Sequence, residues 1–185
     1  MSLESDSKYI YAIHLPPQVA TMPISLYHSI AGQYFVGYAD NMFFEKDKNA
    51  WAALVNPINS GINLYVNVWT VTDLHKPPIR IQIWLNANLP GSPTISDLVT
   101  PSNTAIFPQV RPKIKLLQAS NVVGNPTDGT KGFVRRTIPG ETVVADEEGK
   151  FIIPPGGNFT IFLSNYEEDK TPASVRVAYG WWEDK

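Results

Sequence analysis

The sequence predicts an all-β protein, an antiparallel β-sandwich of jelly-roll type with an extended N-terminal arm. Aliphatic residues occupy every second position in Ile79–Leu85, with Arg80, Gln82 and Trp84 between them, as in a strand with one buried face. Gly, Pro and Asn recur between such runs at the spacing of β-sandwich turns. The last run, Ser174–Glu183, contains the adjacent Trp181 and Trp182, which an extended chain directs to opposite faces of a sheet. Both faces of this strand therefore need cover.

Composition indicates one domain and excludes several classes of partner. The chain has 185 residues, of which 43% are hydrophobic and 17% charged, and its formal net charge is −2. A chain of this length buries about 70% of its unfolded surface in a single core. The weak charge gives no footprint for nucleic acid or anionic lipid, so we expect neither partner. With no cysteine in the sequence, disulfides and thiolate metal sites are excluded.

The chain divides into an arm, residues 1–23, and a β-sandwich domain, residues 24–185. The arm has a polar start, a strand-like segment at Lys8–His14, and then Pro16, Pro17 and Pro23 as stiff spacers. It does not have the basic start and long apolar run of a secretory signal. We therefore expect synthesis in the cytoplasm without a signal peptide, with any extracellular location reached through assembly, lysis or an unusual route.

Strand-like runs follow one another through the domain, and no segment has a convincing helical period. Asn86–Pro112 is the longest irregular stretch, where we expect the chain to cross the top of the sandwich, with helix permitted only around Thr94–Val99. The expected strands are Ile24–Ile30, Tyr34–Tyr38, Ala50–Val55, Ile62–Thr72, Ile79–Leu85, Lys113–Ala119, Gly132–Ile138, Glu141–Val144, Lys150–Ile153, Phe159–Ser164 and Ser174–Glu183.

Nothing in the sequence declares a catalytic, cofactor or metal site, and we predict none of the three. The histidines are His14, His28 and His75, and no Gly-x-Ser-x-Gly elbow supplies a nucleophile for them. The acidic runs at residues 146–148 and 167–169 do not have the ligand spacing of a calcium loop. We interpret them as solvated hairpin tips.

Aromatic residues on the second face of several strands form the main candidate site. Alternation places Tyr65, Trp69, Trp84 and Trp182 on outer faces, and together they would make a large exposed patch. A second layer of the same domain is the simplest cover for them. The arm of the same chain, a neighbouring subunit or stacked sugar rings are the alternatives.

The arm provides a second candidate for interaction. Tyr9, Ile10, Tyr11 and Ile13 make an extended apolar segment, and the prolines behind them oppose a tight hairpin. Such a segment is suited to adding itself to an exposed sheet edge. If that edge belongs to another copy, the product is a homo-oligomer, either a closed ring or an open filament.

Six runs of the sequence are distinctive as strings: Ser25–Gly37, Asn56–Val68, Gln82–Asn86, Leu98–Thr104, Ile153–Gly157 and Tyr179–Glu183. They resemble an uncharacterised domain family found in spore-forming Gram-positive bacteria. The resemblance spans Ile24–Glu183, implies a spore-associated location and implies no established activity. The Pro-Pro-Gly loop at residues 154–156, which feeds an alternating strand, also resembles jelly-roll subunits of phage particles and of spore appendage fibres. Appendage subunits use cysteines in an N-terminal connector, and this arm has none, so assembly would be non-covalent.

Taken together, these features predict a non-enzymatic structural subunit that associates with itself through strand addition and aromatic packing. The alternative is a carbohydrate-binding module. In that case Trp69, Trp84 and Trp182 would stack on sugar rings, and Asn67 and Gln82 would supply polar contacts. An enzyme is the third reading, and its catalytic groups would have to come from loops.

Overall fold

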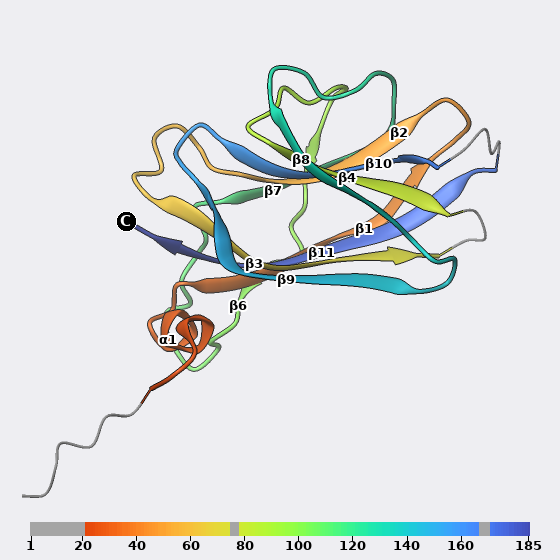
Figure 1. The fold of residues 1–185 in the computed structure, drawn as a ribbon. Coiled ribbons are helices and arrows are strands. Elements are labelled where there is room, and N and C mark those ends of the chain that lie inside the picture. The colour runs from red at the N-terminus through yellow and green to blue at the C-terminus, as the bar shows by residue number, and fades with distance from the viewer. Residues whose placement is uncertain (1–20, 75–77, 167–170) are drawn as a thin grey trace, which may run out of the picture.

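The protein, seen in a computed structural model, is described over residues 21–74, 78–166 and 171–185. In these residues the chain forms one short helix and two antiparallel sheets that pack face to face (Figure 1). The predicted all-β sandwich is therefore confirmed. The elements are α1 (Ile24–Ile30), β1 (Tyr34–Phe44), β2 (Asn49–Val55), β3 (Asn63–Asp73), β4 (Ile79–Leu85), β5 (Thr94–Ile95), β6 (Val99–Pro101), β7 (Lys115–Val122), β8 (Thr130–Arg136), β9 (Thr142–Ile153), β10 (Asn158–Asn165) and β11 (Ala173–Asp184).

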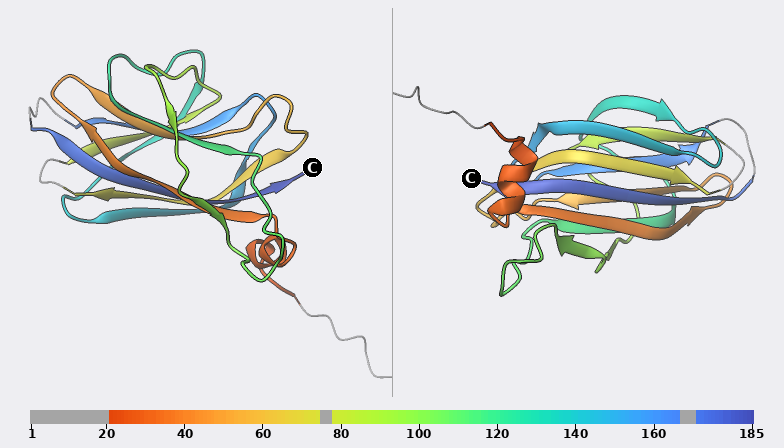
Figure 2. Two further views of the ribbon diagram at one scale, coloured as in Figure 1. Left: turned by 180° about the vertical axis from the view of Figure 1, so that it is seen from behind. Right: turned by 90° about the horizontal axis from the view of Figure 1, so that it is seen from below.

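The strand order in the described residues is that of a jelly roll. One sheet has the order β6-β1-β11-β3-β9 and the other β5-β7-β2-β10-β4-β8. Without β5, β6 and β7, the sheets are β1-β11-β3-β9 and β2-β10-β4-β8, the pattern of two Greek keys. The three extra strands come from one excursion between β4 and β8. They add to β1 and β2, so both sheets are widened on the same side (Figure 2).

The main core lies between the sheets and is rich in aromatic rings. Trp181 points into it from β11 and packs at 6.0 Å from the ring of Phe35 on β1. Tyr179 is also buried there, and its hydroxyl donates a 2.7 Å hydrogen bond to the carbonyl of Ala52. Because the ring is fully enclosed, burial raises the pKa of Tyr179 well above its ordinary value of 10.0.

The buried Tyr179 predicts a loss of stability at alkaline pH. The native state keeps the phenol proton at pH values where the unfolded chain has lost it, so unfolding releases a proton. The contribution of Tyr179 to the free energy of unfolding is therefore present in full below about pH 10, and it is lost as the pH rises toward the native pKa. We expect Tyr179→Phe to cost about 1 kcal/mol near neutral pH and to flatten the alkaline decline. Urea unfolding between about pH 8 and pH 11 measures both, and equal alkaline slopes for the two proteins would contradict the prediction.

A second, smaller core covers the outer face of the sheet β5-β7-β2-β10-β4-β8. Trp51 and Phe162 face outward from β2 and β10 and are buried together with Ala53, Ala119 and Val122. The loop after β4 lies over them, and its Pro90 carbonyl accepts a 2.8 Å hydrogen bond from the Trp51 indole. On this face the cover is therefore a second layer of the same domain.

The prediction of a strand at Ile24–Ile30 is wrong, because the segment forms α1. Pro23 precedes the helix, and Gly32 follows it with a φ of 73° that ends the helical path. No side chain caps its first turn. A helix of seven residues is marginal by itself, so its contacts with β1 and β11 hold it. Because contacts with the sheet hold the helix, the sequence of Ile24–Ile30 alone does not indicate it.

Two other expectations about local structure are also corrected. The strands expected at residues 141–144 and 150–153 are parts of one long strand, β9, which begins at Thr142, and residues 146–148 lie inside it instead of at a hairpin tip. Glu148 and Gly149 have φ values of 50° and 76°, and this bulge interrupts the pairing of β9 with β3. The stretch Asn86–Pro112 contains β5 and β6, with strand where helix was permitted.

Candidate functional site

The outer face of the sheet β6-β1-β11-β3-β9 holds the main candidate site. Cross-strand register places Tyr34 on β1, Trp182 on β11 and Tyr65 on β3 in one row. The prediction that Trp181 and Trp182 face opposite ways is confirmed, since Trp181 is in the core and Trp182 is in this outer row. Trp182 stacks on Tyr65 with ring centroids 5.4 Å apart and an angle of 8° between the planes.

Helix α1 covers this aromatic row. Its one buried residue, His28, stacks on Trp182 at 5.0 Å and 11°, and the His28 Nδ1 lies 2.9 Å from the Gln33 side-chain oxygen. Gly149 on β9 also packs closely against the Trp182 ring, since a Cβ at this position would lie 2.0 Å from it. Trp182 is consequently only 4% exposed. Among the covers that the sequence allowed, the one found over Trp182 is a second layer of the same domain, since α1 lies within residues 24–185.

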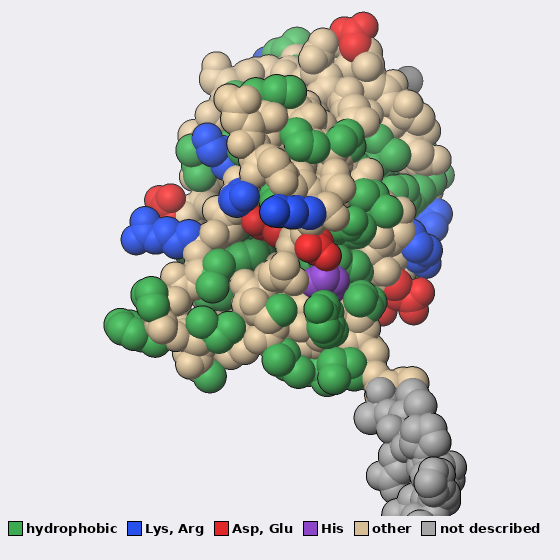
Figure 3. All heavy atoms as spheres, turned by 90° about the vertical axis from the view of Figure 1, so that its left-hand side faces the viewer, with side chains coloured by type: hydrophobic (Ala, Val, Ile, Leu, Met, Phe, Trp, Pro, Cys, Tyr) green, Lys and Arg blue, Asp and Glu red, His purple; other side chains and the backbone are tan. Residues whose placement is uncertain are grey.

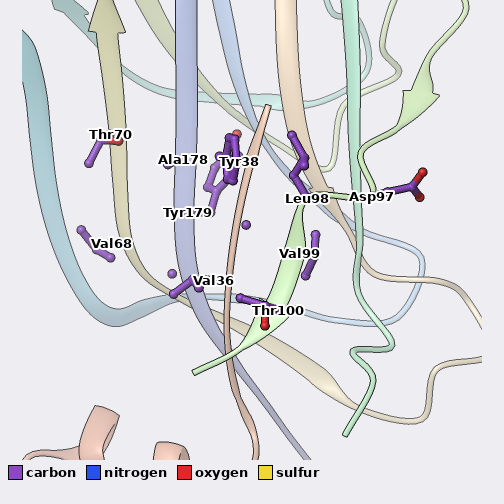
Figure 4. A pocket seen from close by; sticks show the side chains of 12 residues that line it. Val36, Tyr38, Val68, Thr70, Asp97, Leu98, Val99, Thr100, Ala178 and Tyr179 are labelled. Carbon is purple, nitrogen blue, oxygen red and sulfur yellow. The ribbon is translucent and has the colours of Figure 1, made fainter. Parts of the chain in front are cut away.

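An apolar groove of about 450 Å³ continues along the same face beyond the covered row (Figure 4). The groove is open above β11 because Gly180 and Ala178 on this strand have little or no side chain. Val36 and Val68 lie on either side of Gly180 in one cross-strand row. A Cβ on Gly180 would come within 2.8 Å of Val68, so the glycine makes the depth of the groove.

The face becomes polar at the end away from α1. Arg176 on β11 forms an ion pair with Asp40, and the guanidinium holds the pKa of this carboxyl below its ordinary value. Thr72 and Thr142 share a 2.9 Å hydrogen bond between β3 and β9. The apolar groove therefore lies between a helix-covered aromatic end and a polar end.

The four residues of the predicted aromatic platform do not share a face. Tyr65 and Trp182 are together, but Trp69 is in the interior, where its ring packs at 6.4 Å from Phe133. The pairing of β3 with β9 shifts between Val66 and Val68, and this irregularity reverses the alternation that placed Trp69 outside. The Trp69 indole donates a 3.1 Å hydrogen bond to Glu147.

Trp84 lies on the outer face of the other sheet, away from Tyr65 and Trp182. It is half-buried beside the second core, and the Lys131 ammonium lies 4.9 Å from its ring centroid. Its indole nitrogen is buried without a hydrogen-bond partner in the described residues. A single sugar platform built from Trp69, Trp84 and Trp182 is therefore not formed.

Several predicted residues lie outside the described part of the chain. The N-terminal strand residues Tyr9, Ile10, Tyr11 and Ile13 are among them, and so are His14, His75 and the acidic run 167–169. Their proposed roles stay predictions.

An apolar surface at the α1 end of the molecule escaped the sequence reading. Leu26 and Ile30 are 48% and 58% exposed, although they lie on a helix whose other face is packed on the sheet. The loop after β6 adjoins the helix through a 2.8 Å hydrogen bond between Ser29 and Ser102. This loop adds Phe107, which is 94% exposed. We call this set the end surface; its members are Met22, Ile24, Leu26, Tyr27, Ile30, Phe107 and Val110.

Figure 3 shows hydrophobic side chains gathered over this end of the protein, around the histidine. The signal that could have located the surface is the composition of Ile24–Ile30, which contains no Asp, Glu, Lys or Arg and so has no charged face to turn toward solvent if it forms a helix. It was missed because the segment was interpreted as a strand.

A small polar cleft separates the start of α1 from the bulge in β9. Pro23 and Ile24 line one side of this cavity of about 470 Å³, and Asp146 and Glu148 line the other. Tyr34 lies nearby and accepts a 2.8 Å hydrogen bond from Asn67. Burial raises the Tyr34 pKa and the Asp146 carboxylate adds to the rise, whereas the Asn67 hydrogen bond opposes it.

The described residues hold no group of three His, Cys, Asp or Glu side chains that could bind a metal ion. Within the same ranges, no helix has both the length and the apolar character to cross a membrane.

A family model matches residues 8–185 of the chain, and its description is a family of unknown function (DUF6143). The chain belongs to this family. No match was found among the curated proteins or among the solved structures. The DUF6143 match begins at residue 8, so it includes the strand-like segment Lys8–His14 as well as the whole described sandwich.

Proposed function

We propose that this DUF6143 protein is a non-enzymatic structural subunit that associates with copies of itself. The observation that carries the proposal is the end surface. A monomeric soluble protein rarely exposes a contiguous apolar patch of several large side chains, and such patches usually mark an interface. Here the patch joins a helix to a neighbouring loop at one end of the molecule.

The chemistry of the end surface suits a second copy of this chain. Tyr27 is the one member with a side-chain hydrogen-bonding group, and no member carries a charge. An apolar patch around a two-fold axis can face its own image, and burial of its Leu, Ile and Phe side chains then drives association. The sequence supplies no cysteine, so this association is non-covalent.

The way α1 is held supports the same proposal. The helix buries His28 on Trp182 but leaves Ile24, Leu26 and Ile30 exposed. A helix serving as a cover alone would be expected to carry polar residues on its outer side. The outer side of α1 is apolar instead, as expected for a helix with a partner on each face.

The carbohydrate-binding alternative depends on a set of aromatic rings that share one face. Trp69 is in the core, Trp182 lies beneath α1, and Trp84 is on the other sheet. No observation favours this alternative over self-association.

The test compares charge substitutions on the end surface with one elsewhere. We expect Leu26→Asp and Ile30→Asp each to weaken association at least about 30-fold, because a desolvated carboxylate costs about 2 kcal/mol or more at an interface. Light scattering over a concentration series, with negative-stain images of the same samples, measures the assembly. Ile138→Asp is the matched control, since Ile138 is 60% exposed in the connection between β8 and β9.

The native protein is expected to form a discrete oligomer or a filament, and so is the Ile138→Asp variant. A native chain that stays at one chain mass at every concentration would overturn the proposal. So would full assembly of a Leu26→Asp, Ile30→Asp double variant.

A further inference from the structure

The two sides of the sandwich differ in how their sheet edges end. On the side of β1 and β2, the excursion adds β6 to one sheet and β7 and β5 to the other. On the opposite side the last strands are β8 and β9, of seven and 12 residues, and no described strand pairs with their outer edges. Such edges present a row of backbone donors and acceptors to any extended chain.

The edge of β8 is protected by charge. Lys131, Arg135 and Arg136 are all exposed along it. Cationic side chains on an edge strand are a common device against strand addition, because an incoming strand would have to neutralise or displace them. We therefore do not expect an apolar segment to pair with β8.

The first half of β9, Thr142–Asp146, has no such protection. It carries no Lys or Arg, and Val144 at its centre is 64% exposed. The neighbouring Val143 and Ala145 point toward the core and pack against it. The bulge at Glu148 and Gly149 ends this stretch. The result is a five-residue edge without a cation, with three apolar residues at its centre and a defined end.

We infer that this edge is the acceptor for residues 9–13 of a second copy of the chain, an inference that rests on the proposed self-association. Tyr9, Ile10, Tyr11 and Ile13 supply four apolar side chains over five residues, the length of the open edge. In a strand, five residues span about 17 Å. The family match begins at residue 8, so this segment belongs to the family domain.

The described chain begins near the Asp146 end of the open edge, where a segment connected to Pro23 would enter. Pro23 and Ile24 line the same cleft as Asp146, at the inner end of the open edge. A segment that arrives from the end surface would meet Asp146 first and run on toward Thr142. Residue 13 then lies beside Asp146 and residue 9 beside Thr142, so the added strand is parallel to β9.

Residues 14–22 form the tether between the added segment and Pro23, and this tether favours exchange between copies over pairing within one chain. Residues 14–22 contain Pro16 and Pro17, and nine residues of extended, proline-stiffened chain reach about 28 Å. In one chain this tether would have to close on itself, because Pro23 already lies across a cleft from Asp146. Between two copies joined at their end surfaces, the same tether can run directly across the interface.

Engineered cysteines test the inference without competing disulfides, because the native chain contains no cysteine. Tyr11→Cys protein is mixed under mild oxidation with isotopically heavy Val144→Cys protein. Neighbouring strands lie about 4.8 Å apart, which is within the range of Cα separations that a disulfide spans. We expect a mixed covalent dimer by mass spectrometry. Val123→Cys is the matched control, since Val123 is 66% exposed and lies outside β9.

A second pair reports the direction of the added strand. We expect Ile13→Cys to cross-link to Asp146→Cys more than to Thr142→Cys. Equal yields for Val144→Cys and Val123→Cys would overturn the inference. It is also overturned if a chain carrying both Tyr11→Cys and Val144→Cys forms only an internal disulfide.

Light scattering on the native protein separates this inference from the proposed function. If the native chain associates and Leu26→Asp abolishes the association, but no mixed dimer forms, the strand exchange is wrong and self-association stands. If the native chain is monomeric and no mixed dimer forms, both are wrong.

Discussion

Replacement of Glu183 by alanine is expected to lower the free energy of unfolding by about 3 to 5 kcal/mol. The Glu183 carboxylate is buried near the end of β11 and accepts hydrogen bonds from the backbone N–H groups of Lys113 and Ile114, at 2.9 to 3.0 Å. The Trp181 indole donates to the same carboxylate at 3.3 Å. Alanine would leave three donors without this acceptor, and the Ile114 N–H and the Trp181 indole among them are buried, so the loss costs more than an ordinary hydrogen bond.

This carboxylate joins two parts of the chain that lie far apart in sequence. Lys113 and Ile114 lead into β7, at the return of the long excursion, and Glu183 belongs to the last strand. The backbone of Glu183 is fixed too, since its N–H donates to the Gln33 carbonyl at 3.0 Å. The loss should therefore affect the whole sandwich and not one loop.

Urea unfolding followed by tryptophan fluorescence measures the effect. Asp184→Ala is the control, because the one hydrogen bond found at the Asp184 carboxylate comes from the backbone of its neighbour Lys185 in an exposed position. Glu183→Gln keeps one acceptor oxygen and should fall between alanine and the native protein. An alanine variant no less stable than Asp184→Ala would show that the three donors find other acceptors.

Strand positions are the part of this fold that sequence predicts best, and Ile79–Leu85 shows why. Its alternating side chains stay in phase along the whole of β4, with Ile81 and Ile83 in the core and Trp84 outside. The alternation is local, so it can be read without knowledge of any partner strand. The opposite orientations of Trp181 and Trp182 follow from the same rule.

Faces and sheets are harder to predict, because they depend on pairing. Trp69 was assigned to the outer face by alternation, but β3 has one extra residue between Val66 and Val68 relative to β11, and this shifts the phase of its side chains by one residue. Nothing in the run Ile62–Thr72 signals this shift, which arises opposite the bulge in β9. Trp84 and Trp182 were grouped because both are outward, yet topology places their strands in different sheets.

The candidate site was recovered in part. Sequence identified Tyr65 and Trp182 as outer aromatics in need of cover, and the structure stacks them. The cover itself was missed, because α1 is a helix through its contacts with the sheet and not through its own propensity. The end surface was missed with it, since an apolar strand and an apolar helix of seven residues differ little in composition.

The tryptophan pair supports the last prediction, which separates the role of the core from the role of the cover. Trp181→Ala and Trp182→Ala should each cost about 3 to 5 kcal/mol, because each removes a large buried ring. Their local effects should differ. Trp182 contacts α1 through the stack with His28, whereas Trp181 packs with Phe35 inside the sandwich.

Hydrogen exchange of the amides in residues 22–31 distinguishes the two variants under conditions where both remain folded. We expect Trp182→Ala to release α1, so that its amides exchange about 100-fold faster, the change that corresponds to a loss of about 2.7 kcal/mol in local opening. In the Trp181→Ala variant, the amides of α1 should stay protected from exchange up to the limit set by the lowered global stability of that variant. Equal protection of α1 in the two variants would mean that the helix is held by contacts other than Trp182.

The same pair connects the cover with assembly. If α1 presents the end surface, its release in Trp182→Ala should weaken self-association although no member of that surface has changed. Trp181→Ala, measured at a temperature where it is fully folded, should associate as the native chain does. Since both variants lose one indole from the same strand, a difference in assembly between them can come only from the face to which the ring belongs. Light scattering of the two proteins side by side would then show that Trp182 positions the helix for its partner.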